Sequence, residues 1–434
     1  MKTGWPMLTV LALLPVVRWM MLMPLDQRFG APVVALLSIG QITGMVGLTL
    51  YSFDLLLSTR LQIFEDLFGG LNRVYIAHHI IGGIALVALM VHPVMLALRL
   101  AASSLRDAAL LLVPQVADLP MAYGIFSLVG LIALMIVTFF VSLPYRVWLL
   151  THKLLGVVFF LGGLHVLLVP SALYNDALLK WLLLGYVGIG LAAFVYRTVL
   201  PRIFIRRYNY VVRAATMVGD GVMQIDMLPV RAGINFKAGQ FVFLSFRQPG
   251  VSQEWHPFSV SSAPHDPNLS ITMKALGSYT KLLTQMQAGL AGANVVVEGA
   301  YGRFNFRNFK NPRQVWVAGG IGITPFLAMA RDLGTLPCAI DLYYSVRNET
   351  ELVDFNVLQQ VGNPVTGQNF RVIPFVSSKQ GYLTAKFINE TSGGLLDKDI
   401  LLCGPPSMMK SLKTQMGTLG VKKSQIHSEE FSMS

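Results

Sequence analysis

The first 200 residues are dominated by long, unbroken apolar runs. Six runs lie near residues 6–24, 31–54, 74–97, 121–143, 147–169 and 178–200. Each has about the 20 residues that a helix needs to cross a bilayer. Prolines and charged residues separate the runs, as in Pro24-Leu25-Asp26-Gln27-Arg28. The pattern predicts six transmembrane helices. Because the first run is short and contains Arg18, the count could differ by one; no small-residue cleavage site follows it, so we interpret it as a helix rather than a signal peptide.

From Phe204 the pattern changes to short, alternating segments typical of strands. Examples are residues 208–213 and 239–244, with turns at 219–221 and 249–250, as expected for a small antiparallel barrel. After Asn311-Pro312, buried-strand runs at 315–318, 339–345 and 399–403 alternate with helix-like stretches, which favours a parallel α/β sheet. The predicted domains are therefore a membrane bundle at 1–203, an antiparallel barrel at 204–311 and an α/β domain at 312–434.

The composition supports this division. The chain has 434 residues, of which 54% are hydrophobic and only 13% charged. Residues 1–200 contain 11 Lys/Arg and 7 Asp/Glu, or 18 charges, whereas residues 201–434 contain 23 and 15, or 38. Intrinsic disorder and a disulfide-built fold are excluded. Two cysteines cannot supply the four thiolates of an iron–sulfur cluster, and no C-x-x-C-H motif for c-type haem occurs.

The net charge of +12 does not indicate a nucleic-acid partner, because the surplus largely lies at membrane boundaries and no basic-aromatic groove motif occurs. It instead predicts the orientation of the bundle. With the N-terminus inside, nine basic residues lie on the inner face and four on the outer face. The inner set is Lys2, Arg60, Arg73, Arg146, Lys153, Arg197, Arg202, Arg206 and Arg207; the outer set is Arg28, Arg99, Arg106 and Lys180. The second half of the chain is then expected in the cytoplasm.

Five histidines lie in two of the predicted membrane helices. His78, His79 and His92 are in the third, and His152 and His165 are in the fifth. The separation from His78 to His92 is 14 residues, about 21 Å of helix, and that from His152 to His165 is 13, about 19.5 Å. Because ionisable residues in a membrane usually face a functional interior, two matched pairs favour two b-type haems, each held by two imidazoles.

Alternatives remain at this point. The histidines could instead connect helices by hydrogen bonds or relay protons. The step from His78 to His92 is 14 residues and returns to within about 40° of the same helix face, whereas the 13-residue step from His79 misses by about 140°. This favours His78 over His79. The step from His152 to His165 on the fifth helix, however, is itself 13 residues. Arg18 could snorkel to the interface, contact a haem propionate or attract an anionic oxygen species. Several glycines would let a macrocycle approach the backbone, and close helix packing explains them nearly as well. They are Gly82, Gly83, Gly156, Gly162 and Gly163.

A glycine-rich segment follows the strand predicted at 315–318. In Gly319-Gly320-Ile321-Gly322, backbone N–H groups at the start of a helix would attract a pyrophosphate. The segment is not a G-x-G-x-x-G fingerprint, and alone it is a weak signal.

Together these features resemble the NADPH oxidase and ferric reductase superfamily, and specifically a bacterial NADPH oxidase-like flavocytochrome b. The histidines match its two-haem core. His256-Pro257-Phe258-Ser259 resembles its flavin motif, and the segment from Lys274 through Gly277, Ser278 and Thr280 resembles its flavin-pyrophosphate segment. Lys274 stands where the family commonly has Arg, so the bidentate grip on phosphate is lost.

The same resemblance assigns a nicotinamide nucleotide site. It includes the loop of Gly319, Gly320, Ile321, Gly322, Thr324 and Pro325, and the segment Cys403-Gly404-Pro405 beside the nicotinamide. Arg347 falls where related reductases hold the 2′-phosphate of NADPH, which favours NADPH over NADH. Phe431 resembles the aromatic residue that covers the flavin, although an edge-strand residue would look the same. Cys403 and Phe431 are the residues expected beside the reacting rings.

The resemblance implies an oxidoreductase that takes electrons from cytoplasmic NADPH through FAD and two b-type haems to an outer acceptor. The outer segments 24–31, 98–120 and 169–177 are short and contain no evident metal-ligand cluster, which favours oxygen, giving superoxide. A ferric chelate and a periplasmic partner protein are the alternatives, and a haem-free transporter is a more distant one. The expected location is a bacterial inner membrane, with lipid around the helices.

Overall fold

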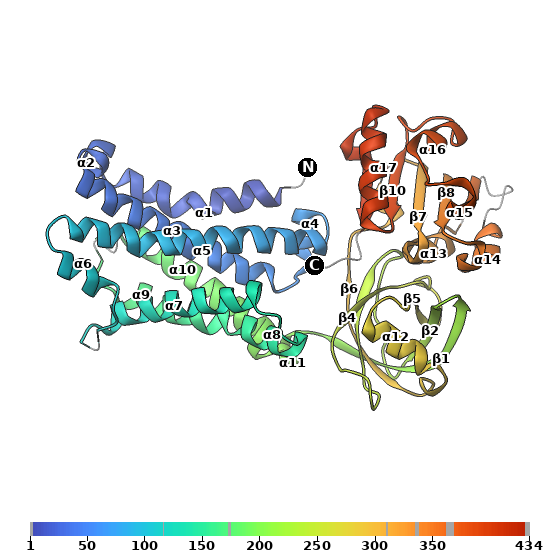
Figure 1. Cartoon of the computed structure of the whole chain (residues 1–434), viewed down its shortest axis with the longest axis horizontal. Coiled ribbons are helices and arrows are strands. Elements are labelled where there is room, and N and C mark those ends of the chain that lie inside the picture. The colour runs from blue at the N-terminus through green and yellow to red at the C-terminus, as the bar shows by residue number, and fades with distance from the viewer. Residues whose placement is uncertain are drawn as a thin grey trace. The chain divides into compact units, whose positions relative to one another are not determined.

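The computed structural model describes residues 3–115, 117–171, 175–309, 311–334, 338–361 and 369–429. The chain divides into two compact units, Met1–Ile205 and Arg206–Ser434, and each is described by itself. The first unit is helical and the second combines two β-sheets with helices (Figure 1).

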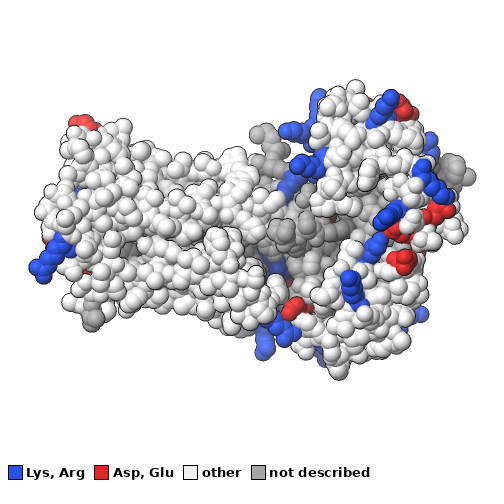
Figure 2. Space-filling view, in the orientation of Figure 1, with Lys and Arg blue, Asp and Glu red and all other residues white. Residues whose placement is uncertain are grey.

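The first unit contains the six predicted spans, and this prediction is confirmed. Helices long and apolar enough to cross a membrane are Gly4–Met21, Pro32–Leu57, Leu71–Ala101, Leu119–Phe140, Tyr145–Leu168 and Ala177–Val199. Figure 2 shows that the drawn side of this unit is almost free of charged residues along its length. Each apolar surface can therefore face lipid chains. In the labels of Figure 1 the helices are α1 (Gly4–Met21), α2 (Leu25–Phe29), α3 (Pro32–Leu57), α4 (Gln62–Phe68), α5 (Leu71–Ala101), α6 (Leu105–Leu111), α7 (Leu119–Phe140), α8 (Tyr145–Lys153), α9 (Leu155–Leu168), α10 (Ala177–Phe194) and α11 (Pro201–Phe204).

Helix α3 is central to the bundle, because it packs against α5, α10 and α1, while α7 packs on α9. Buried side chains on α3 connect these helices by hydrogen bonds to backbone carbonyls. The Tyr51 hydroxyl donates to the Leu155 carbonyl at 2.7 Å, and the Ser52 hydroxyl donates to the Tyr186 carbonyl at 2.6 Å. Such bonds hold helices together where lipid offers no hydrophobic drive for association.

The fifth span is not one straight helix. It consists of α8 and α9, which meet at Leu154. The Leu154 N–H is shared between the Leu150 carbonyl at 3.3 Å and the Thr151 carbonyl at 3.1 Å, and the second, i to i−3 bond tightens the backbone at this point. A straight-helix angular count between His152 and His165 therefore crosses an irregular turn.

The second unit begins with a six-stranded antiparallel sheet in the order β4-β3-β6-β1-β2-β5. Its apolar side chains, such as Met223, Ile225 and Leu244, fill the barrel interior. The elements are β1 (Arg207–Gly219), β2 (Val222–Pro229), β3 (Phe241–Phe246), β4 (His256–Ser259), β5 (Leu269–Lys274), α12 (Ser278–Gln285) and β6 (Asn294–Tyr301).

A five-stranded sheet follows, in the order β11-β10-β7-β8-β9, and all its strand pairs are parallel, as predicted. Helices pack around a core that includes the fully buried Trp316 and Tyr343. The elements are β7 (Arg313–Gly319), α13 (Thr324–Arg331), β8 (Ala339–Val346), α14 (Phe355–Gln359), β9 (Asn369–Val376), α15 (Ser377–Gln380), α16 (Ala385–Thr391), β10 (Asp399–Cys403), α17 (Pro406–Thr418) and β11 (Ile426–Glu429).

Candidate functional site

Two histidines from different membrane helices face each other at one end of α5. The ring centroids of His78 on α5 and His152 on α8 are 6.1 Å apart. His152 stacks on Trp148 at 5.2 Å, and its buried Nδ1 has no hydrogen-bond partner among the described residues. His79 is the neighbour whose side chain is exposed, whereas only 15% of the His78 side chain is exposed. His78 is thus the residue of this pair that faces His152.

The other two histidines lie farther along α5 and α9. His92 and His165 are close enough to interact electrostatically. The His92 Nδ1–H donates to the Gly40 carbonyl at 2.7 Å, and the His165 Nδ1–H donates to the Pro120 carbonyl at 2.8 Å. Because a carbonyl oxygen can only accept, each Nδ1 carries the proton and each Nε2 keeps a lone pair for a metal.

Glycines make room for these two imidazoles. A Cβ atom on Gly44 would lie 2.8 Å from His92 Nδ1, and one on Gly124 would lie 2.8 Å from His165 Nδ1. Those two glycines were not singled out from the sequence. Of the glycines that were, Gly156 lies against Phe194 and Gly163 against Val187, which is ordinary helix packing. The donor set of four paired imidazoles fits two six-coordinate haems, for which imidazole is a standard axial ligand.

Arg18 has a protein partner that the sequence did not indicate. Its Nε lies 3.1 Å from Oδ1 of Asp176, the residue that caps α10 by accepting a hydrogen bond from the Leu179 N–H at 2.7 Å. The ion pair lowers the pKa of the Asp176 carboxyl. Arg18 therefore connects α1 to α10.

In the second unit, the predicted flavin segments lie on adjacent elements. β4 carries His256, Pro257, Phe258 and Ser259 and pairs with β3. The His256 ring stacks on Tyr279 at 3.7 Å, so β4 lies against α12. Burial lowers the pKa of His256, although Glu254, 3.7 Å away, opposes the effect.

The helix α12 begins where a flavin pyrophosphate is expected. Gly277 precedes it with open space around its Cα, and Ser278 is its first residue. The Thr280 hydroxyl accepts hydrogen bonds from the Leu276 and Gly277 N–H groups, both at 3.1 Å. These contacts fix the turn before a helix N-terminus, which favours phosphate.

The glycine-rich segment lies at the carboxyl edge of the parallel sheet. It continues β7 through a 3₁₀ turn, Gly320–Ile323, into α13, whose first residues are Thr324 and Pro325. Gly320 has a φ of +54°. A Cβ atom on Gly322 would lie only 2.3 Å from the Cys403 carbonyl oxygen. The turn after β7 therefore touches the turn after β10.

That second turn contains the other predicted nicotinamide residues. A Cβ atom on Gly319 would lie 2.7 Å from Pro405, and one on Gly404 would lie 2.9 Å from the Gly319 Cα, so these glycines also allow close approach. The Cys403 side chain is fully buried, and burial raises the pKa of its thiol well above the ordinary value. Its thiol is therefore not a reactive thiolate. Phe431 lies outside the described residues.

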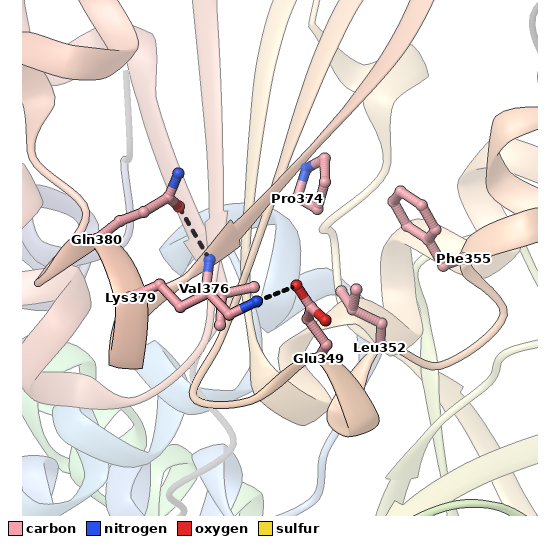
Figure 3. A pocket seen from close by; sticks show the side chains of 7 residues that line it. All are labelled: Glu349, Leu352, Phe355, Pro374, Val376, Lys379 and Gln380. Carbon is pink, nitrogen blue, oxygen red and sulfur yellow. Dashed lines mark hydrogen bonds and ion pairs between the residues drawn. The ribbon is translucent and has the colours of Figure 1, made fainter.

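Arg347 is exposed immediately after β8, and its carbonyl accepts a hydrogen bond from the Ser378 N–H at 3.2 Å. The residues that follow each of these two positions line a pocket of about 490 Å³ (Figure 3). In this pocket the Lys379 ammonium lies 2.7 Å from the Glu349 carboxylate, and Gln380 accepts a hydrogen bond from the Val376 N–H. The pocket opens at the carboxyl ends of β8 and β9, where open α/β sheets bind ligands. Its lining is Glu349, Leu352, Phe355, Pro374, Val376, Lys379 and Gln380.

Comparisons with known families match three successive parts of the chain. Residues 43–163 match a ferric reductase-like transmembrane component, residues 207–305 an FAD-binding domain, and residues 316–414 an oxidoreductase NAD-binding domain. The chain belongs to the NADPH oxidase and ferric reductase superfamily. This confirms the resemblance inferred from its motifs, and the order of the three matches is that of the predicted membrane, flavin and nucleotide domains.

Individual relatives within the superfamily are distant. The chain is 27% identical to the heavy chain of a superoxide-generating NADPH oxidase from Dictyostelium discoideum, over 58% of this chain and 51% of that protein. It is also 27% identical to the ferric reduction oxidase 8 of Arabidopsis thaliana, over 58% of this chain and 35% of that protein. A flavohemoglobin structure from Malassezia yamatoensis has a TM-score of 0.51 and 18% identity, covering 92% of this chain and 98% of that one, which supports similarity of fold alone. The chain spans little more than half the length of the first curated relatives it matches.

Sequence analysis missed one residue of this site, Asp54 near the end of α3. Its Oδ1 lies 2.8 Å from His78 Nδ1. The signal was present, because Asp54 is the only acidic residue in the six described spans, and an acidic residue inside a membrane is expensive enough to suggest a function.

Proposed function

We propose that this protein transfers electrons from NADPH across a membrane, through FAD and two b-type haems, to oxygen on the opposite side. The four membrane histidines carry the proposal, since His78 faces His152, and His92 and His165, which interact electrostatically, lie about 20 Å farther along the helices. Bound FAD supplies the conversion of a two-electron hydride to single electrons, which is what haem iron takes.

The membrane residues would hold the haems and exclude water. His78 and His152 are the proposed ligands of one haem, and His92 and His165 those of the other. The backbone carbonyls of Gly40 and Pro120 fix the orientation of the latter two rings and keep the proton on Nδ1. Such outer partners also make an imidazole a better donor to iron.

The second unit would hold the flavin and the nucleotide. We assign the flavin ring to the β4 residues His256, Pro257, Phe258 and Ser259, and its pyrophosphate to Lys274 and the start of α12. We assign the NADPH pyrophosphate to the turn after β7 and the nicotinamide to the segment at Cys403, Gly404 and Pro405. Because the Cys403 thiol is buried and protonated, its contribution is to shape the wall of this site, not to act as a base or nucleophile.

The coenzyme is proposed to be NADPH because of the pocket at the carboxyl edge of the sheet. Lys379 lines this pocket and is paired with Glu349, while Arg347 is exposed at the end of β8, where its carbonyl is bonded to Ser378, the residue before Lys379. A 2′-phosphate would find a charge-assisted partner in Arg347, whereas NADH has no group for it. We also place Phe431 over the flavin.

For the acceptor, we propose oxygen giving superoxide. Relatives named as a superoxide-generating NADPH oxidase and a ferric reduction oxidase match with equal identity, so the assignment rests on the short connections between the predicted outer helix ends. The segments between α1 and α3 and between α9 and α10 leave little protein to select a large acceptor. With the N-terminus on the inner side, the flavin and nucleotide domains would face the cytoplasm, and we propose a bacterial inner membrane as the location.

The experiment uses the purified, haem-loaded full chain with FAD and NADPH in air. Reduction of cytochrome c is followed with and without superoxide dismutase. We expect the dismutase to abolish most of the signal. A His92→Leu variant is expected to lose the outer haem and most of the superoxide while retaining reduction of FAD by NADPH.

Two results would overturn the proposal in different ways. An unchanged rate with dismutase would mean that electrons leave directly to the added protein, which would favour a ferric chelate or a periplasmic protein as the natural acceptor. Absence of a Soret band after loading with haem would remove the haem relay itself and favour the interpretation of these histidines as proton-relay groups.

A further inference from the structure

The four proposed haem ligands differ in what holds their second ring nitrogen. His92 and His165 each donate to a neutral backbone carbonyl, and the His152 Nδ1 has no partner among the described residues. His78 alone has a carboxylate partner: its Nδ1 lies 2.8 Å from Oδ1 of Asp54 and 3.1 Å from the Asp54 carbonyl oxygen. The two proposed haem sites are therefore electrostatically unequal.

Asp54 lies close to His78 because of its position on α3 and because Gly82 on α5 has no side chain. It lies in the last turn of α3, one turn after Tyr51, whose hydroxyl fixes α3 against the Leu155 carbonyl. On α5, Gly82 is one turn beyond His78, and a Cβ atom there would lie 3.3 Å from both carboxylate oxygens of Asp54. Glycine thus leaves the room that the carboxylate uses.

Among the described residues, the His78 ring is the partner found for the Asp54 carboxylate. Asp54 Oδ1 is buried and has no hydrogen-bond partner among the described residues: the His78 Nδ1–H donates to the Asp54 carbonyl oxygen, and Oδ1 lies beside Nδ1 at 2.8 Å as an ion-pair contact. Only 15% of the Asp54 side chain is exposed. A carboxylate in a membrane helix is expensive, and the imidazole N–H of His78 is the group that compensates it.

We infer that Asp54 is a positioning residue that lowers the redox potential of the inner haem relative to the outer haem. This inference rests on the proposed function. Because both oxygens of Asp54 lie close to Nδ1, the proton stays on Nδ1 and Nε2 keeps a lone pair for a metal. The negative charge 2.8 Å from Nδ1 polarises this N–H more strongly than a carbonyl alone, which would make the imidazole more basic and would stabilise ferric over ferrous iron.

The difference would set the direction of transfer. The inner haem would give up its electron more readily than the outer haem, whose two ligands donate to neutral carbonyls; the Asp118 carboxylate also acts on His165, without a hydrogen bond to it among the described contacts. With both haems bound, one electron lost by the ferrous inner haem would be gained by the ferric outer haem, so the transfer would balance without another reactant. The unequal charge beside the two pairs of histidines would thus favour movement away from the flavin side.

The test is a redox titration of the purified full chain, loaded with haem and followed by its absorption spectrum, for wild type and Asp54→Asn. Asn has nearly the same shape but no charge. We expect the lower of the two haem potentials to rise by about 59 mV. For a one-electron couple this corresponds to a tenfold change in the ferric-to-ferrous ratio. The higher potential should stay unchanged, and one of the two ferric haem signals in electron paramagnetic resonance should shift. Thr49→Val, which removes a buried hydroxyl that donates to the Met45 carbonyl of its own helix at 2.8 Å, is the control.

A second pair of variants provides the test if Asp54→Asn does not bind the inner haem. Gly82→Ala crowds the carboxylate but keeps its charge, whereas Gly83→Ala places its Cβ where no atom lies within 4 Å. We expect Gly82→Ala to raise the lower potential and Gly83→Ala to leave both unchanged.

The outcomes separate the inference from the proposed function. Two haem potentials in the wild type that remain unchanged in both Asp54→Asn and Gly82→Ala would overturn the role of Asp54 and leave the relay intact. Equal shifts of both potentials would also overturn it, because a local hydrogen bond cannot act equally on both sites. A wild-type protein that binds no haem would instead contradict the proposed function.

Discussion

Lys274 Nζ lies 2.7 Å from Glu351 Oε2, and this ion pair joins the end of β5 in the barrel to the segment after β8 in the nucleotide domain. Lys274 is also the residue proposed to contact the flavin pyrophosphate. The Lys274 ammonium would therefore be shared between two anions, the Glu351 carboxylate and the flavin pyrophosphate. A second contact crosses the same boundary, since Arg331 donates to the Ser261 carbonyl at 3.1 Å and to the Asp354 carboxylate at 3.0 Å.

The competition at Lys274 gives a prediction for flavin affinity. Glu351→Gln should release the ammonium and tighten FAD binding by about two- to fivefold, the range for a partly exposed ion pair. Lys274→Met should weaken FAD binding. Fluorescence titration of FAD into the flavin-free full chain measures both effects. Glu349→Gln is the control, because Glu349 pairs with Lys379 instead. Weaker binding in Glu351→Gln would mean that the pair positions Lys274 for the flavin.

His256 predicts a pH dependence of stability. Burial lowers the pKa of His256 in the folded protein, whereas the unfolded residue titrates near 6.5. Between these values the unfolded state binds more protons, so stability falls as the pH drops below about 6.5 and is fully present above it. His256→Gln should reduce this loss. The thermal midpoint of the second unit in the full chain, measured between about pH 5.5 and 7.5, provides the test.

The matched control for that measurement is His265→Gln. The His265 side chain is 67% exposed, so its removal should leave the pH dependence unchanged. An identical slope in wild type and His256→Gln would show that other groups cause the acid sensitivity.

The glycine-rich turn predicts a contrast between two neighbouring substitutions. In Gly322→Ala the new Cβ would meet the Cys403 carbonyl oxygen at 2.3 Å, and a backbone atom of a buried strand cannot move aside cheaply. The turn should shift, and the rate of FAD reduction by NADPH should fall by about a hundredfold, as expected for misplaced reactants. Gly320→Ala has nothing within 4 Å and only the positive φ to oppose it, about 1 kcal/mol.

Stopped-flow reduction of the bound flavin measures this contrast. FAD content, determined before each measurement, separates a slow hydride step from loss of flavin. Equal rates in the two variants would contradict the close approach of the turns after β7 and β10.

The sequence was sufficient for the elements whose pattern is strong. Six long apolar runs have few alternatives to membrane helices, and the buried strands at 315–318 and 399–403 are as predicted. The edge strands β9 and β11 were not predicted, because β9 contains Pro374 and β11 is half polar. A sheet edge tolerates a proline and polar residues in a strand.

The membrane site was predictable in its ligands and not in their surroundings. Spacing singled out the histidines, and the 14-residue step on the third span favoured His78 over His79, but the 13-residue step on the fifth span weakened that argument, because the count could not foresee the turn at Leu154. The contact between Asp54 and His78 joins residues 24 positions apart on different helices. Only the packing of α3 on α5 creates it, so no local pattern contains it.

Arg347 gives the last prediction, which concerns the choice of coenzyme. A guanidinium that pairs with a 2′-phosphate contributes about 1.5–3 kcal/mol, so Arg347→Gln should lower kcat/KM for NADPH by about 10- to 100-fold and leave that for NADH unchanged. Lys379→Gln is the matched comparison. Because Lys379 is already paired with Glu349 at 2.7 Å, its loss should have a smaller effect on NADPH. Steady-state rates with both coenzymes measure the ratio. If Arg347→Gln lowered both values equally, Arg347 would support the shape of the site, and the preference for the phosphorylated coenzyme would have to come from another residue.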